Sequence, residues 1–173
     1  MFSWDMARSG LLLFLRRGMW GWAQVLAEPA ITPREQNYPS SIAWPLHRGH
    51  SAVVILDAIQ ELEQSCRQLL DGKDKRQFAE IIICLHKILH GLSSNGPLRD
   101  FNDILFFQSA RFWFLLLEKM NFRQQVEDLL DELRMIRRSL ELRDVRLVAT
   151  VHKSHLAMVL SRLDAIEADS QLV

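Results

Sequence analysis

Histidine is the residue type whose spacing in this chain comes nearest to a chemical site. The six histidines fall into three pairs: His47 and His50, His86 and His90, and His152 and His155. A spacing of three or four residues places both imidazoles of a pair on one face of an α-helix, as helical zinc and iron sites require. Two such helices could supply a four-histidine metal site, made of His86, His90, His152 and His155.

A second interpretation treats these histidines as part of the protein core. His152 lies between Val148 and Leu156 in an apolar stripe, where a hydrogen-bonded core histidine is common. The chain also lacks the Glu-x-x-His motif that helical di-iron proteins use. We therefore rank the core interpretation above the metal site and expect no cofactor.

Residues 134–153 form a basic segment with six cations against two acids. The cations are Arg134, Arg137, Arg138, Arg143, Arg146 and Lys153. A local excess of positive charge could contact phosphates, which makes a nucleic-acid-binding regulator an alternative function. An acidic run directly before the segment offers ion pairs within the helix, and the whole chain has a formal net charge of zero. A solvated, charge-balanced helix face is the competing interpretation.

Tryptophan is concentrated near the N-terminus, where four of the five occur in the first 44 residues. With two neighbouring arginines they form a candidate partner-binding arm: Trp4, Arg16, Arg17, Trp20, Trp22 and Trp44. Tryptophan and arginine are enriched at the energetic centres of protein interfaces. The same composition would suit peripheral membrane contact, or an arm that folds back and completes the core of its own chain.

Motifs of the common enzyme classes are absent from the sequence. It contains no phosphate-binding glycine loop, no Gly-x-Ser-x-Gly elbow and no His-Glu-x-x-His. We therefore expect a protein that is not an enzyme.

Glycine and proline divide the chain unevenly, because all seven glycines and all five prolines precede Leu98. These residues break helices, so their positions outline the elements. We predict an all-α fold, a bundle of five to six helices with long C-terminal helices. Residues 1–46 should form an N-terminal helix or aromatic arm with a proline-rich linker, and residues 47–173 the bundle domain.

Helical periodicity predicts elements over residues 51–70, 74–92, 98–120 and 121–140, with Asp74 and Asn121 as N-terminal caps. The 98–120 helix is apolar most of the way round, which predicts that it is the buried centre. A new apolar stripe begins at Val145, rotated by about 140° from the preceding one. Either the helix breaks between Ser139 and Asp144, or one long helix presents two faces.

The remaining expectations concern compartment and function. Cys66 and Cys84 should be buried thiols, which fits a reducing, cytoplasmic location, and no stretch reaches the roughly 18 apolar residues of a membrane span. The leading functional hypothesis is a helical protein-interaction module, an adaptor, regulatory or chaperone-like accessory subunit. Its partner would be another protein or a second copy in a homodimer.

Overall fold

The computed structural model describes residues 52–93 and 95–171, and these ranges are helical, without a strand. In chain order the elements are α2 (Ala52–Gln68), α3 (Lys75–Gly91), α4 (Gly96–Leu116), the short 3-10 helix η2 (Leu117–Lys119), α5 (Phe122–Glu141) and α6 (Val145–Gln171). The all-α prediction is confirmed for this part of the chain. The predicted arm and linker, residues 1–46, lie outside the described residues.

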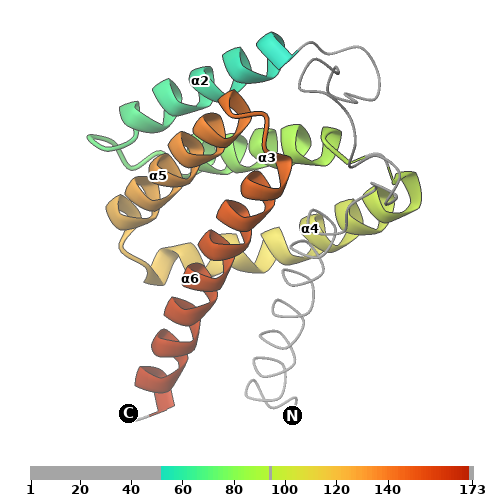
Figure 1. Cartoon of the computed structure of the whole chain (residues 1–173). Helices are drawn as coiled ribbons and strands as arrows, with labels where there is room; N and C mark the ends of the chain where they lie inside the picture. The colour runs from blue at the N-terminus through green and yellow to red at the C-terminus, as the bar shows by residue number, and fades with distance from the viewer. Residues whose placement is uncertain (1–51, 94, 172–173) are drawn as a thin grey trace.

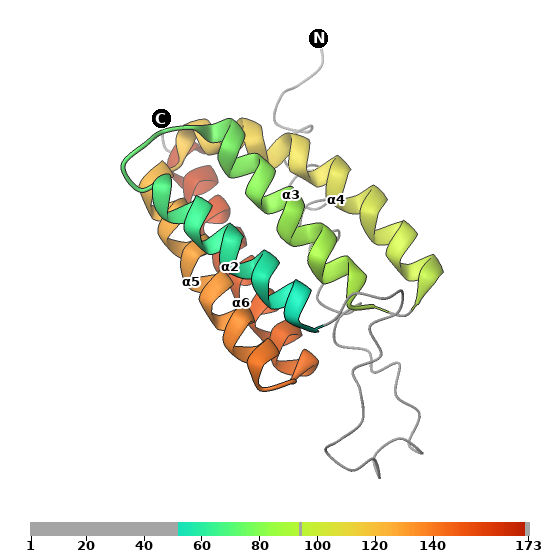
Figure 2. The ribbon, with the colours of Figure 1, turned by 90° about the horizontal axis from the view of Figure 1, so that it is seen from above.

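Helix α5 holds the central position in the described bundle. It packs against α2 on one side and α6 on the other, and α2 also packs against α3. Figures 1 and 2 show α4 next to α3, at the edge of the bundle opposite α5. The core is formed mainly by side chains of four helices: Ile59, Cys66, Phe78, Leu85, Leu89, Leu133, Ile136 and Val148.

The prediction that the 98–120 helix is the buried centre is wrong. Phe101, Ile104 and Phe107 of α4 are 56%, 55% and 47% exposed. No large hydrophobic side chain described within α4 is fully buried. The large number of apolar residues in this helix makes burial on every side possible. It does not show that neighbouring helices cover every face. One face of α4 packs on the bundle, and its second apolar face points outward.

The helix ends between Ser139 and Asp144, and α5 and α6 are separate helices. Of the two alternatives, a break and one long helix with two faces, the structure shows the break. Arg143 adopts a left-handed backbone with φ 57°. Its N–H donates to the Leu140 carbonyl at 2.9 Å, and the Asp144 N–H donates to the Ser139 carbonyl at 3.0 Å. This pair of bonds is a Schellman ending, which commonly has glycine at the left-handed position. The side chain of Asp144 then accepts from the Leu147 N–H and begins α6.

The predicted caps of α3 and α5 are confirmed. Asp74 accepts a hydrogen bond from the Gln77 N–H at 2.9 Å, and Asn121 accepts from the Gln124 N–H at 3.2 Å. Each satisfies a backbone donor that a helix start leaves open. The prediction of long C-terminal helices is confirmed too, since α5 has 20 residues and α6 has 27.

Candidate functional site

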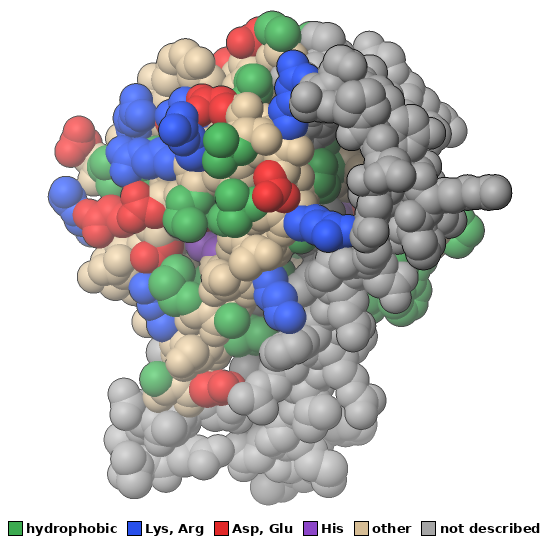
Figure 3. All heavy atoms as spheres, in the orientation of Figure 1, with side chains coloured by type: hydrophobic (Ala, Val, Ile, Leu, Met, Phe, Trp, Pro, Cys, Tyr) green, Lys and Arg blue, Asp and Glu red, His purple; other side chains and the backbone are tan. Residues whose placement is uncertain are grey.

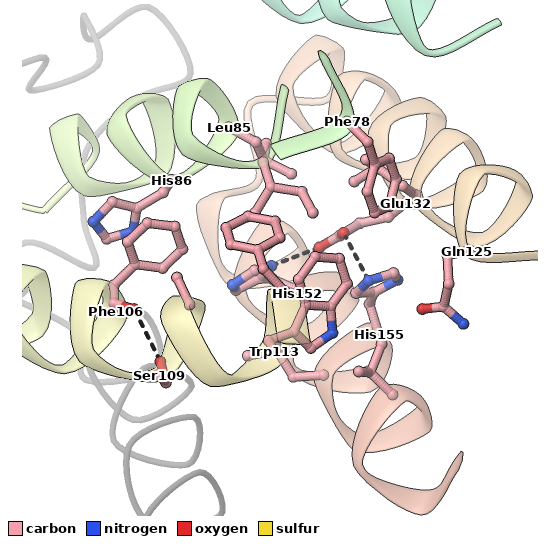
Figure 4. Close-up of a pocket in the computed structure, with 16 residues that line it drawn as sticks. Phe78, Leu85, His86, Phe106, Ser109, Trp113, Gln125, Glu132, His152 and His155 are labelled. Atoms are coloured by element: carbon pink, nitrogen blue, oxygen red, sulfur yellow. Dashed lines mark hydrogen bonds and ion pairs between the residues drawn. The ribbon is translucent and has the colours of Figure 1, made fainter. Parts of the chain in front are cut away.

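A cavity of ≈ 110 Å³ lies where α3, α4, α5 and α6 meet (Figure 4). Its walls are mostly apolar and include the aromatic side chains of Phe78, Phe106 and Trp113. Polar side chains from α5 and α6 enter the same space. We call this cavity the four-helix pocket and treat it as the candidate ligand site.

Helical spacing explains how the four-helix pocket is lined. Residues four and three apart share a helix face. Three helices each present such a set to the pocket: Phe78, Ile82 and Leu85 of α3, Gln125, Leu129 and Glu132 of α5, and His152, Leu156 and Val159 of α6. The α5 set therefore brings two polar side chains, Gln125 and Glu132, into a pocket whose walls are mostly apolar.

Glu132 is the charged centre of the pocket, although it is only 3% exposed. One carboxylate oxygen lies 2.5 Å from Nδ1 of His152, and the other lies 3.4 Å from Nε2 of His155. Burial by itself raises the pKa of Glu132, but the charges of His155 and His152 and the hydrogen bond from His152 outweigh burial and lower it. The carboxylate is therefore held ionised and links α5 to α6.

A second histidine pair meets a different carboxylate. His86 is 2% exposed, stacks on Phe106 with ring centroids 3.8 Å apart, and has Nε2 2.6 Å from Oδ1 of Asp103. Nε2 of His90 lies 3.4 Å from the other Asp103 oxygen. Burial lowers the pKa of His86 to about 4, with Asp103 opposing the shift. At neutral pH the imidazole is therefore uncharged, and its N–H donates to Asp103 between α3 and α4.

Each pair of the four predicted metal-binding histidines thus lies next to a carboxylate of its own. His86 and His90 face Asp103, whereas His152 and His155 face Glu132. Within the described ranges, no group of three or more His, Cys, Asp or Glu side chains is arranged to hold a metal ion. The burial of His86 and His152 agrees with the core interpretation.

Glu132 is the site residue that sequence reasoning missed. Glu132 belongs to the acidic run that precedes the basic segment (Glu127, Asp128, Asp131 and Glu132), for which the sequence predicts a solvated helix face. The signal was its position, three residues after Leu129 and four before Ile136 on a buried face of α5. A carboxylate at that position needs a cationic or hydrogen-bonding partner.

Arg137 of the basic segment makes a structural ion pair. Its Nε lies 2.6 Å from Glu63, a nearly fully buried carboxylate of α2, and its Nη1 lies 2.7 Å from Glu141. Arg67 reaches the other Glu63 oxygen at 3.3 Å. Arg137 therefore neutralises a buried charge between α2 and α5.

Two further cations of the basic segment also pair with acids. Arg134 lies 2.8 Å from Asp131, and Arg138 lies 3.1 Å from Glu141. Figure 3 shows basic and acidic side chains intermixed on the face it presents. The remaining members, Arg143, Arg146 and Lys153, are exposed on the turn and along α6. Three of the six cations thus pair with acids, and the other three are exposed.

The two cysteines differ in environment, which corrects the prediction of two buried thiols. Cys66 is fully buried, and burial raises the pKa of its thiol to about 12, with Arg134 opposing the shift. Cys84 is exposed, and both residues are free thiols. Cys84 precedes Leu85 and lies off the face of α3 that carries Ile81 and Leu85 into the core.

No helix within the described ranges combines the length and apolar character needed to cross a membrane. Comparison of the chain with protein-family models, with curated proteins and with solved structures found no match.

Proposed function

We propose that this chain is a non-enzymatic helical protein-interaction module, an adaptor, regulatory or chaperone-like accessory subunit that buries a partner's apolar surface. The main support for this proposal is an exposed apolar face of α4, formed by Phe101, Ile104 and Phe107. We call these three residues the α4 outer face. Each is about half exposed although each is strongly apolar.

The spacing of the α4 outer face supports the proposal. Single exposed apolar residues are normal on protein surfaces, whereas a contiguous group is typical of an interaction site. Residues three apart on a helix are neighbours, so the three side chains form one stripe. Phenylalanine is also enriched at protein interfaces.

The α4 outer face would contribute part of the binding free energy of a complex. Fully burying a Phe or Ile side chain contributes roughly 1.5–3 kcal/mol. Covering the exposed halves of three such side chains then contributes about 3 kcal/mol, equivalent to about 100-fold in Kd. Removal of the stripe should therefore dissociate a complex of moderate affinity.

The test compares the size of the native assembly in two variants. Tagged protein isolated from its native extract is measured by size exclusion with light scattering. We expect the wild-type chain to run as a complex with a partner or a second copy, and the double variant Ile104→Asp with Phe107→Asp to run alone. Leu142→Asp is the matched control, because Leu142 is 59% exposed but lies on the α5–α6 turn. A wild-type monomer, or equal loss in the control, would contradict the proposal.

We also propose a cytoplasmic location, which the exposed free thiol of Cys84 supports because such thiols persist in reducing compartments. The tryptophan arm stays a prediction, as a second contact to the same partner.

A further inference from the structure

Gln125 places a side-chain amide in the lining of the four-helix pocket, with no hydrogen-bond partner among the residues that the structure describes. The residue is 4% exposed and lines the pocket from α5. Its side-chain amide makes no hydrogen bond with any other described residue. An amide that faces a cavity in this way can donate to or accept from a bound molecule.

Flat aromatic surfaces form much of the wall of the four-helix pocket. Trp113 stacks on Phe78 with ring centroids 5.6 Å apart, and Phe106 stacks on His86. Figure 4 shows Trp113 of α4 next to Glu132 and the α6 histidines, whereas Phe106 of α4 lies beside His86 of α3. Aromatic walls favour planar ligands, because rings stack or meet edge to face.

The size of the pocket limits the ligand to about one ring. The cavity measures ≈ 110 Å³. Sites for drug-sized molecules measure about 300–1,000 Å³, whereas an apolar cavity of about 150 Å³ binds benzene. A fused multi-ring ligand would not fit without movement of α4.

The charges of the pocket favour a neutral ligand. Glu132 is already compensated by His152 and His155, at 2.5 and 3.4 Å. A ligand carboxylate would approach a buried anion, and a ligand ammonium would compete with both imidazoles. A hydroxyl group can meet the Gln125 amide without disturbing this cluster.

We propose that the four-helix pocket is a binding site for a neutral single-ring aromatic molecule with one hydrogen-bonding substituent, of the phenol class. The ring lies between the aromatic walls, and the hydroxyl group bonds to the amide of Gln125. The α4 outer face takes no part in this site, so the ligand site and the partner-binding proposal can fail independently.

The test uses titration of the full ¹⁵N-labelled chain with phenol, benzene and benzoate, followed by amide chemical shifts. We expect phenol to bind with shifts centred on residues of the pocket, benzene to bind about tenfold more weakly, and benzoate more weakly still. Shifts that are absent with both phenol and benzene at 10 mM would overturn the proposal. Tighter binding of benzoate than of phenol would overturn the assignment of a neutral ligand.

Two glutamine variants test the role of the amide. Gln125→Leu should weaken phenol binding about tenfold and leave benzene binding unchanged. Gln124→Leu is the matched control, because Gln124 is the preceding residue of α5, is exposed and donates to Asp128. Equal phenol affinity in Gln125→Leu and wild type would overturn the assigned hydrogen bond.

A pocket-filling variant separates the cavity from a surface site. Ala110→Leu places a larger side chain in the α4 wall and should abolish binding of both phenol and benzene. Thermal unfolding of this variant checks that it is folded. Unchanged ligand binding by folded Ala110→Leu would overturn the location of the site.

Discussion

Mild acid should destabilise this protein through one buried histidine, His86. Its pKa is about 4 in the folded protein, against an ordinary value of 6.5, mainly because burial disfavours the charged imidazole. As pH falls below 6.5, the unfolded chain binds a proton at His86 that the folded chain does not. The free energy of unfolding therefore decreases from about pH 6.5 downward, and the loss is complete near pH 4.

The size of this effect follows from the two pKa values. The full difference between 6.5 and about 4 corresponds to roughly 3 kcal/mol, of which about 2 kcal/mol is lost by pH 5. The groups around His86 are Asp103 on α4, His90 on its own helix and His152 on α6. Glu132, whose pKa is lowered, loses its contribution only below its ordinary value of 4.5. Measurement between pH 7.5 and 5 therefore separates His86 from Glu132.

The assay is urea unfolding of the wild type and His86→Gln at pH 7.5 and pH 5. Glutamine keeps a donor for Asp103 but does not titrate. We expect the loss of unfolding free energy over this range to be about 2 kcal/mol smaller in His86→Gln than in the wild type. The control His90→Gln faces the same aspartate and should retain the contribution of His86. Equal pH dependence in His86→Gln and wild type, or an imidazole titration near 6.5 by NMR, would refute the reasoning.

Three further predictions concern stability and reactivity. Glu132→Leu leaves two imidazoles facing an apolar pocket without their carboxylate partner. We expect it to lower the free energy of unfolding at pH 7, measured by urea unfolding, by about 3 kcal/mol. A decrease below about 0.5 kcal/mol would contradict the ion pair. Arg143→Gly removes the steric strain of a side chain at a left-handed backbone position. We expect it to raise the thermal unfolding midpoint, with a gain in unfolding free energy of up to about 1 kcal/mol. A lower midpoint would count against the Schellman ending. Iodoacetamide at pH 8 should label Cys84 and spare Cys66 until the chain unfolds, as read by peptide mass spectrometry, and early labelling of Cys66 would show that its thiol is not buried.

Local sequence signals predicted the helices and the starts of α3 and α5. Asp74 and Asn121 could be identified because an N-terminal cap depends on one side chain and a backbone N–H three residues later. The end of α5 was harder to identify. Arg143 holds the left-handed position where glycine is usual, so the break was predicted only as one of two alternatives.

Tertiary features could not be predicted to the same degree. The apolar composition of α4 was plain from the sequence, but which of its faces the bundle covers depends on where the other helices lie. The carboxylate partners of the histidines could not be predicted for the same reason. The spacing put His152 and His155 on one face, but only the packing of α5 against α6 brings Glu132 to them.

Site-specific photocrosslinking is the most direct test of partner binding by the α4 outer face. Benzoylphenylalanine replaces Phe107 in the native cells, and it replaces Glu61, an exposed residue of α2, as the control. We predict one discrete crosslinked product from position 107, identified by mass spectrometry, which disappears when Ile104→Asp is added. The absence of a specific product from position 107, or the same product from position 61, would contradict the proposed function.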